Sequence, residues 1–370
     1  MIADALKLSV YFGDSLTAGG ELAGDALMRA LARCDVEVAT LLRGVEGFGI
    51  NRRIHAERLP DTSTDLPLLA VVIDRRERIE ALLPVVDRVI SRGLVTLEHA
   101  RLATGADVAE MALPPGRGEA AKLTIYCGRG ERSGGRPAYR EIVELLRRQG
   151  ATGAIVLMGI DGVLRGARRS ARVFAVDALT PMAITSVGPR AILERLPPLL
   201  GAAVEDPIVT FERIAQLKHD GELLEPLPWS GSVGGNTSDD DEQDEDEDIP
   251  DVWHTLRIYT RRSAQVNGRA LYSELTRRLR EIGAAGATTI LGEWGFSSDE
   301  APYGDRAWRV TSHTPSYTVY IDRPHKLAAA WPLVDELTAR HGIVTSLTVP
   351  GYRERAGATV HGRLEIPPRL

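Results

Sequence analysis

"LKLSVYFGDSLTAGGELAGDALMRALARCDVEVATLLRGVEGFG" (residues 6–49) recurs twice more in this chain of 370 residues. Residues 121–164 read "AKLTIYCGRGERSGGRPAYREIVELLRRQGATGAIVLMGIDGVL", and residues 254–297 read "HTLRIYTRRSAQVNGRALYSELTRRLREIGAAGATTILGEWGFS". The landmarks keep the same spacing in each copy, without a gap. They are Tyr11, Tyr126 and Tyr259; Gly20, Gly135 and Gly268; Gly44, Gly159 and Gly292; and Gly47, Gly162 and Gly295. A repeat of this length indicates three copies of one structural unit.

The hydrophobic pattern of each copy predicts the element order β-α-β-loop-β-α-β. In copy one, alternation over residues 6–12 is typical of a strand, and the apolar spacing over residues 21–33 predicts a helix. Further strands are expected at 36–43, 66–74 and 94–102, with a second helix at 75–91. A proline, Pro84, Pro197 or Pro332, lies within the apolar helical pattern of each second helix, and Pro84 is expected to bend that of copy one. Tyr11, Tyr126 and Tyr259 are predicted to be core residues.

This order of elements indicates a ferredoxin-like α+β sandwich, with two helices on one face of an antiparallel sheet. The strands "LPLLAVVID" (residues 66–74) and "GAIVLMGI" (residues 153–160) are apolar on both alternations, which is typical of strands buried on both faces. Burying apolar surface stabilises a fold by ~25 cal/mol per Å². We therefore expect the three copies to pack as an intramolecular pseudo-trimer, with the chain itself monomeric.

The domain boundaries follow from the repeat and from the composition between its copies. The tract "DDDEQDEDED" (residues 239–248) holds nine acids, and removing them would change the formal net charge from −6 to +3. Such a block of like charge is predicted to be disordered. The predicted organisation is residues 1–103 for copy one, 104–119 for a linker, 120–217 for copy two, 218–252 for an acidic disordered linker, 253–352 for copy three and 353–370 for a C-terminal tail.

Several classes of protein are disfavoured by composition. Two cysteines, Cys34 and Cys127, fit neither a disulfide framework nor a cysteine metal site. The histidines show no metal-ligand spacing, so no metal and no cofactor is expected. The first residues lack the pattern of a secretory signal, and no apolar run approaches the ~20 residues of a membrane helix. We expect a cytoplasmic protein.

Two segments resemble a known family. "LLRGVEGFGINRRIHAERL" followed by "TDLPLLAVVID" (residues 41–59 and 64–74) resembles the hallmark of the domain of unknown function 190 family, which belongs with PII-like signalling proteins. Copy two resembles the first half of the same family over residues 123–162, and copy three is similar but weaker. The resemblance implies a trimeric ferredoxin-like fold with clefts between protomers, over which the loop after strand two reaches. It also implies adenine nucleotides as ligands and a protein partner, a membrane transporter or an enzyme.

The loop of residues 44–59 carries the residues of a candidate anion site. Its glycines are expected to expose backbone N–H groups, its arginines to hold phosphate, and its histidine to donate a tunable hydrogen bond. In copy two, residues 159–174 form a second basic loop, and the arginines of residues 128–137 precede a helix N-terminus, where Pro137 is expected in the first turn. The predicted ligand-binding residues are Gly44, Gly47, Gly49, Arg52, Arg53, His55, Arg58, Arg129, Arg132, Arg136, Gly159, Gly162, Arg165, Arg168 and Arg169.

A sharper hypothesis joins the long loop of copy one to the short loop of copy two in one composite site. In copy three, Asp299, Glu300 and Asp305 replace most of the basic character, so the three clefts are expected to differ. An alternative interpretation of these loops is a surface for protein contact without any ligand.

The first hypothesis for function is a PII-like regulator, not an enzyme, that binds a small anionic effector such as an adenine nucleotide and signals to a protein partner. The second is an interaction scaffold that binds no ligand and uses its loops and acidic tract for docking. RNA binding is poorly supported and no nucleic acid is expected, because the chain lacks the aromatic RNP strand motif. Catalysis has the least support, since no nucleophile–base set, metal-ligand spacing or acid pair recurs in the copies.

Overall fold

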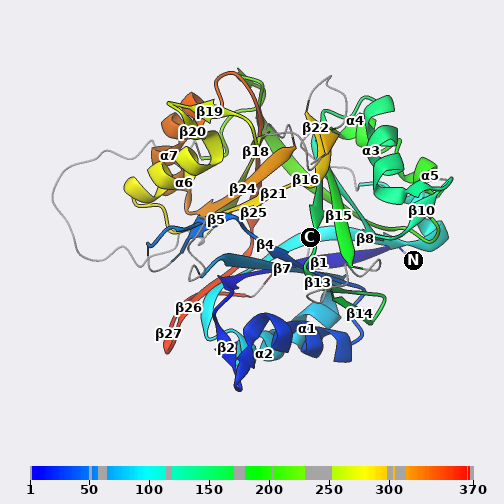
Figure 1. Cartoon of the computed structure of the whole chain (residues 1–370), viewed down its shortest axis with the longest axis horizontal. Coiled ribbons are helices and arrows are strands. Elements are labelled where there is room, and N and C mark those ends of the chain that lie inside the picture. Colours follow the sequence, from blue (N-terminus) through cyan, green and yellow to red (C-terminus); the bar gives the residue numbers. More distant parts are fainter. Residues whose placement is uncertain are drawn as a thin grey trace.

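The computed structural model describes residues 2–49, 52–56, 65–113, 119–170, 180–201, 204–229, 252–297, 303–304, 314–364 and 366. Over these residues the fold is α+β, with seven α-helices, one 3-10 helix and a hydrogen-bonded network of 21 strands. Helices α1 and α2, α3 to α5, and α6 and α7 lie at three corners of the molecule, with the strands between them (Figure 1).

Repeat one has the strand order β8–β1–β7–β4, and every neighbouring pair is antiparallel. That order is the one expected of a ferredoxin-like βαββαβ unit. The helix α1 buries Leu27, Met28 and Leu31 against the sheet, and Pro84 lies inside α2. The elements are β1 (Ile2–Gly13), β2 (Thr17–Ala18), β3 (Glu21–Leu22), α1 (Ala23–Arg33), β4 (Val38–Arg43), β5 (Glu46–Phe48), β6 (His55–Ala56), β7 (Pro67–Arg75), α2 (Arg76–Val89) and β8 (Arg92–Thr104).

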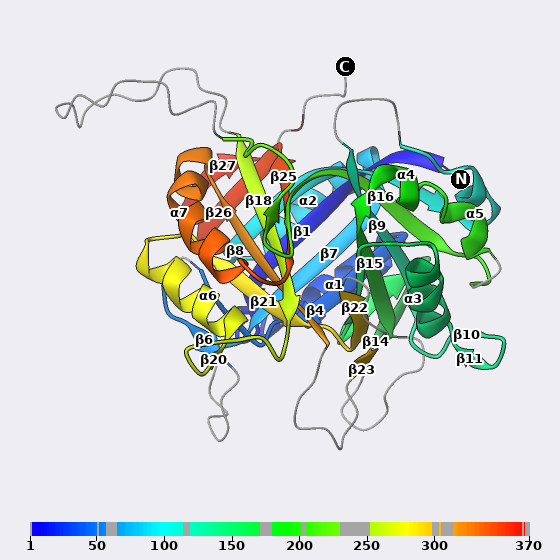
Figure 2. The ribbon, with the colours of Figure 1, turned by 90° about the horizontal axis from the view of Figure 1, so that it is seen from above.

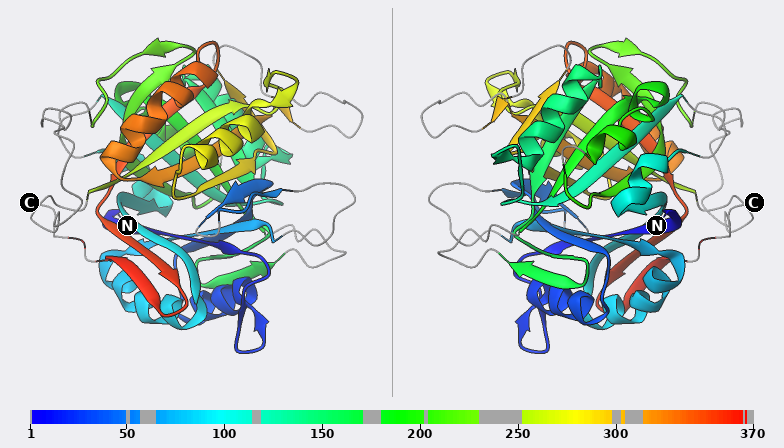
Figure 3. Two further views of the ribbon diagram at one scale, coloured as in Figure 1. Left: turned by 90° about the vertical axis from the view of Figure 1, so that its left-hand side faces the viewer. Right: turned by 90° about the vertical axis from the view of Figure 1, so that its right-hand side faces the viewer.

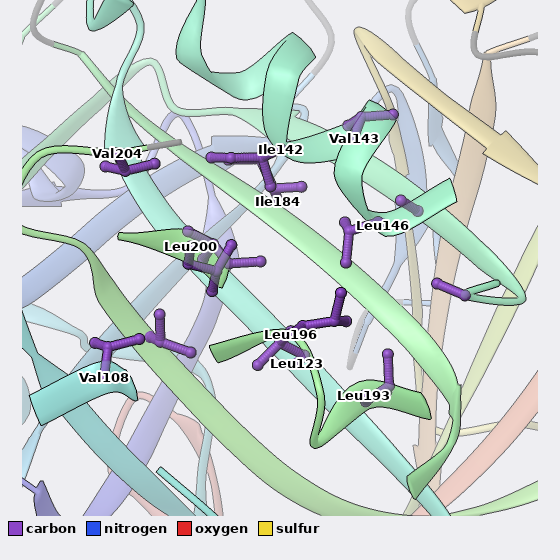
Figure 4. Close-up of a cluster of buried hydrophobic side chains, with 14 of the residues drawn as sticks. Val108, Leu123, Ile142, Val143, Leu146, Ile184, Leu193, Leu196, Leu200 and Val204 are labelled. Atoms are coloured by element: carbon purple, nitrogen blue, oxygen red, sulfur yellow. The ribbon is translucent and has the colours of Figure 1, made fainter. Parts of the chain in front are cut away.

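Repeat two has the equivalent order β16–β9–β15–β12. The core between its helices and its sheet also receives Val108 from the 3-10 helix η1 (Gly105–Glu110), so the predicted linker 104–119 contributes to this repeat (Figure 4). The elements are β9 (Ala120–Gly128), β10 (Arg132–Ser133), β11 (Arg136–Pro137), α3 (Ala138–Arg148), β12 (Gly153–Met158), β13 (Asp161–Leu164), β14 (Ala167–Ser170), β15 (Pro181–Pro189), α4 (Arg190–Leu193), α5 (Pro197–Leu200) and β16 (Ile208–His219).

Two expectations for repeat two need correction. The apolar pattern predicts one second helix that contains Leu196 and Pro197, but the structure divides it into α4 and α5, because the consecutive prolines at 197 and 198 remove two backbone donors and start a new helix at Pro197. Pro137 lies in β11 and is the N-cap residue of α3, so it precedes the first helical turn instead of lying in it.

Repeat three has the order β25–β18–β24–β21. The predicted tail 353–370 is partly a β-hairpin, β26–β27, which lies along the edge strand β8 of repeat one (Figure 3). The elements are β18 (Trp253–Arg261), β19 (Gln265–Val266), β20 (Arg269–Ala270), α6 (Leu271–Glu281), β21 (Ala287–Leu291), β22 (Trp294–Ser297), β23 (Tyr303–Gly304), β24 (Pro315–Asp322), α7 (Pro324–Leu337), β25 (Ile343–Val349), β26 (Gly351–Ala356) and β27 (Thr359–Arg363).

A small hairpin, absent from the predicted element order, follows the first strand of each repeat: β2–β3, β10–β11 and β19–β20. Its turn contains Gly20, Gly135 or Gly268, with φ of 86°, 81° and 75°. Glycine adopts this left-handed conformation without a steric penalty, and a glycine pair or Asn-Gly is favoured in a two-residue hairpin turn. The repeated glycine at this position is therefore a requirement of the turn.

The hairpin strands after the second strand of each repeat join the repeats to one another. The strand β13 of repeat two pairs with β4 of repeat one, β22 of repeat three pairs with β12 of repeat two, and β5 of repeat one pairs with β21 of repeat three. These three pairings form a closed cycle. Seen from above, β1 and β7 are visible between the helices of repeats two and three (Figure 2), and in the view turned by 90° they lie next to α1 and α2 (Figure 1).

Part of the predicted acidic linker 218–252 is folded against repeat three. The short strand β17 (Glu222–Leu223) pairs with the end of β16. Trp229 is only 2% exposed and contacts the rings of His254 and Trp331 edge-on, at centroid distances of 6.2 and 6.0 Å. The acidic tract 239–248 lies outside the described residues.

The faces that the three sheets turn toward one another bury an apolar cluster with members from every repeat. The sequence suggested purely apolar faces, but the structure shows that these faces also carry charged side chains. Lys7 and Lys122 both bond Glu212, at 2.6 and 2.5 Å, and Lys7 also contacts Glu98. Arg257 bonds both oxygens of Glu98, at 2.6 and 2.7 Å. We call these five residues the central charge cluster.

Candidate ligand site between repeats one and three

The pairing of β5 with β21 brings the long loop of repeat one onto repeat three. Gly47 lies opposite Thr288, and Val45 donates its N–H to the Thr289 carbonyl at 2.9 Å. Beside this junction is a cavity of about 150 Å³. The site is therefore assembled from segments more than 200 residues apart in the chain.

The walls of this cavity are mainly apolar and come from both repeats. Repeat one contributes Tyr11, Phe12, Phe48 and Leu94. Repeat three contributes the first two residues of β21 together with Val319 and Ile321, and the following hairpin contributes Tyr352. Tyr352 is fixed by stacking on Trp253, with ring centroids 3.4 Å apart and planes within 5°. Flat apolar walls of this kind suit a planar ring.

The rim of the cavity carries charged groups of both signs. Arg53, His55 and Arg92 supply donors, and Asp65 and Glu354 supply carboxyls. Asp65 accepts a hydrogen bond from the Ser15 N–H at 2.9 Å. Partial burial raises the pKa of Glu354, and neighbouring Asp322 adds to this against the opposing effect of His361. The rim thus carries both exposed guanidinium groups and carboxyls, and of the carboxyls Asp65 is already engaged by the Ser15 N–H.

The equivalent cleft between repeats three and two is much smaller. It measures about 20 Å³ and is lined by the matching residues, with Tyr259, Phe296 and Ile343 in place of Tyr11, Phe48 and Leu94. Its described lining contains no charged side chain. Of these two clefts, the one between repeats one and three therefore has both the larger volume and the cationic rim.

The structure disperses the other predicted arginines. Arg52 has a φ of 50° and reaches the Gly283 carbonyl at 3.4 Å. Arg129, Arg132 and Arg136 lie at the short loop of repeat two, where they contact Met158, the Gly135 carbonyl and Glu141. The composite site of copy one with copy two is therefore wrong, because the long loop of repeat one meets repeat three.

Two arginines of the second basic loop, Arg165 and Arg168, are in ion pairs. Arg165 bonds Asp206 at 2.9 Å, and Arg168 bonds Asp161 and also Asp25 of repeat one, the latter at 2.7 Å. Arg169 lies in β14, opposite Gly162. Arg58, Asp299, Glu300 and Asp305 lie outside the described residues.

Four of the predicted glycines, Gly44, Gly47, Gly159 and Gly162, lie where another strand or side chain approaches closely, partly from a neighbouring repeat. The Gly44 N–H donates to the Pro67 carbonyl at 2.8 Å, which leaves it no free donor for an anion. A Cβ at Gly47 would lie 2.6 Å from the Ala287 carbonyl oxygen of repeat three. Gly159 and Gly162 meet the side chain of Thr40 and the carbonyl of Ala39 in the same way, and Gly49 has open space around it.

Within the described residues, no group of three or more potential metal-ligating side chains is arranged to hold an ion. Over the same residues, no helix has both the length and the apolar character needed to cross a membrane.

The sequence profile of DUF190, described as an uncharacterized ACR, matches three stretches of the chain, at residues 5–102, 120–216 and 253–350. The chain belongs to the DUF190 family. The match confirms the family resemblance inferred from the repeated motifs and the presence of three tandem copies. Each DUF190 copy coincides with one ferredoxin-like unit, and the β26–β27 hairpin follows the third copy.

Sequence reasoning missed Arg92, Tyr352 and Glu354 in the wall of the site. A partial signal existed for Arg92, because each copy has an ionisable side chain at this position. The equivalent residues in the other two DUF190 copies are Asp206 and His341. Tyr352 and Glu354 lie beyond the third copy, and only the pairing of β26 with β8 brings them to the cavity.

Proposed function

We propose that the protein is a PII-like regulator that binds a small anionic effector, an adenine nucleotide, in the cleft between repeats one and three. Its three DUF190 copies act as an intramolecular pseudo-trimer, and the closed cycle of hairpin pairings supports this packing. The observation that carries the proposal is the 150 Å³ cavity with apolar walls and a rim of Arg53, His55 and Arg92.

The chemistry of the cleft fits the two parts of a nucleotide. Aromatic and aliphatic walls favour a planar base, and guanidinium groups at the rim favour phosphate oxygens in bidentate geometry. Ligand sites of this type commonly lie between domains and combine apolar walls with a few polar groups. Occupancy would fix the residues around Arg53 and His55, and a protein partner such as a transporter would respond to that change.

The test is thermal unfolding with ATP, ADP, AMP, cyclic AMP and cyclic di-AMP. A ligand at about 100 times its dissociation constant adds about 2.7 kcal/mol to the free energy of unfolding. Arg53→Ala is expected to remove most of this gain. Arg132→Ala is the matched control, because Arg132 lies on repeat two and contacts only the Gly135 carbonyl among the contacts described for it.

The outcomes separate the hypotheses. If no nucleotide stabilises the unmodified protein, the ligand-free interaction scaffold becomes the better description. If Arg132→Ala removes the nucleotide effect and Arg53→Ala keeps it, the ligand binds at the short loop of repeat two instead of the cleft described here.

A further inference from the structure

A second cavity, of about 50 Å³, lies inside the molecule where the three repeats meet. Its lining includes Lys7 from β1, Lys122 from β9 and Arg257 from β18, which are three cations of the central charge cluster. This volume exceeds the ~10–15 Å³ needed to hold one water but is too small for a nucleotide. The cavity is thus a separate feature from the cleft of the proposed function.

The central charge cluster does not balance. Lys7, Lys122 and Arg257 face two carboxylates, Glu98 and Glu212, and all five side chains are buried. Among the described residues of the cluster, one positive charge is therefore in excess. A buried charge without compensation is costly, and proteins avoid it by pairing the charge or by neutralising the group.

Unpartnered polar atoms accompany this excess charge. Arg257 is 2% exposed; its Nη2 bonds Glu98 and its Nε bonds Tyr317, yet its Nη1 has no hydrogen-bond partner in the described structure. The hydroxyls of Tyr259 (8% exposed) and Thr40 (1% exposed) also lack a partner there. All three residues line the cavity. Buried donors of this kind are normally satisfied.

We propose that this central cavity binds a small monovalent anion of chloride or bromide size. One negative charge would balance the cluster, and the anion would accept hydrogen bonds from the groups that lack partners. A divalent anion such as sulfate would replace one excess positive charge with one excess negative charge. This charge balance favours a monovalent halide over sulfate.

Proton uptake is coupled to this site. Burial lowers the pKa of Lys122 to about 7, with Lys7 and Arg257 adding to the effect and Glu212 and Glu98 opposing it. Below pH 7 Lys122 carries its proton and the excess charge exists; above pH 7 it is neutral and the cluster balances without an anion. Halide affinity is thus expected to fall as the pH rises through 7. The other titratable groups facing the cavity are Tyr11, Tyr126, Tyr259 and Tyr317, whose pKa values burial raises.

The first experiment is diffraction from crystals of the full chain soaked in bromide, with anomalous scattering recorded at the bromine absorption edge. The expected result is a peak in the central cavity near Arg257 and Lys122 at pH about 6, and a weaker peak or none at pH about 8. Bromide only at the protein surface at both pH values would overturn the proposal.

The second experiment compares thermal unfolding in bromide and in gluconate, which is too large for the cavity, at equal ionic strength. At pH about 6 the midpoint of the unmodified protein should be about 2–4 °C higher in bromide. Lys122→Met leaves two cations facing two carboxylates and should abolish the difference. Lys326→Met removes an exposed lysine charge and should keep it, which controls for general salt effects.

Tyr259→Phe provides a milder variant, because it removes one unpartnered hydroxyl and keeps every charge. It should weaken the bromide effect without abolishing it. A bromide effect that persists unchanged in Lys122→Met would contradict the proposal, as would its absence from the unmodified protein. Neither result would affect the nucleotide test, which reads out Arg53 in a different cavity.

Discussion

Gly47, Gly162 and Gly295 show how a single atom governs contact between repeats. In each case a Cβ would press into the backbone carbonyl of a neighbouring repeat: Ala287, Ala39 or Ala154. All three glycines were identified from the repeat, and for Gly47 and Gly162 the sequence suggested anion binding as the reason. Close approach of two strands explains their recurrence in all three copies, whereas the cationic character of the loops differs between copies.

The first prediction concerns Gly47. Gly47→Ala should lower the free energy of unfolding by about 1–3 kcal/mol, because its Cβ would overlap the Ala287 carbonyl oxygen across the junction of repeats one and three. Gly49→Ala, two residues away with nothing within 4 Å of its Cβ, should change that free energy by no more than about 0.5 kcal/mol. Denaturant titration measures both, and equal effects of the two substitutions would refute this account of the junction.

The central charge cluster is also visible at the scale of single residues, once the structure is known. Lys7 and Lys122 occupy the same position in copies one and two, as do Glu98 and Glu212, whereas copy three has Thr255 and Leu347 there. Arg257 lies two residues further along its strand and supplies the third cation. A charged residue in an apolar strand pattern was the available signal, but its partners could not be read from the sequence.

At the scale of elements, individual strands and helices were predicted more accurately than the segments that connect them. The predicted strand 66–74 and helix 75–91 correspond to β7 and α2, because apolar periodicity and turn residues act within a few residues of one another. The connector after β16 was predicted to be disordered throughout. Its first part instead pairs as β17 and places Trp229 in the core of repeat three, since one large aromatic side chain buries enough apolar area to order a polar segment.

The second prediction concerns this connector. Trp229→Ala should lower the free energy of unfolding by about 3–5 kcal/mol, because it empties a packed site beside His254 and Trp331. Leu224→Ala, in the same segment but at a residue that is 47% exposed, should have a small effect. Circular dichroism during urea unfolding provides the measurement, and a Trp229→Ala protein as stable as Leu224→Ala would show that the segment is only loosely attached.

For the whole molecule, the cycle of strand pairings and the shared cluster couple the three repeats. Tyr11 lines both the outer cleft and the central cavity, so the two sites share one side chain. Ion pairs such as Lys7–Glu212 and Glu98–Arg257 join different repeats inside this core. Unfolding one repeat would therefore expose apolar surface and leave buried charges of the other two unpaired.

The third prediction follows from this coupling. A monomer of 40.2 kDa should unfold in a single calorimetric transition, with van't Hoff and calorimetric enthalpies in agreement, although proteins with several domains usually deviate from two-state behaviour. Sedimentation equilibrium checks the mass. Three separated transitions would mean that the repeats unfold as independent domains. The shared core would then contribute little to the free energy that couples them.

The sequence by itself determined the triplication, the family, the α+β class and most element positions, because hydrophobic periodicity, turn glycines and prolines act over short stretches of chain. Only the tertiary structure decided that the loop of Arg53 meets repeat three, that Arg168 is held by Asp25, and that five charged residues gather at the centre. Those contacts depend on the order in which the repeats close their cycle and on strand register across more than a hundred residues. Neither quantity is encoded in the local pattern of any one repeat, so the candidate site could be predicted by residue type but not by partner.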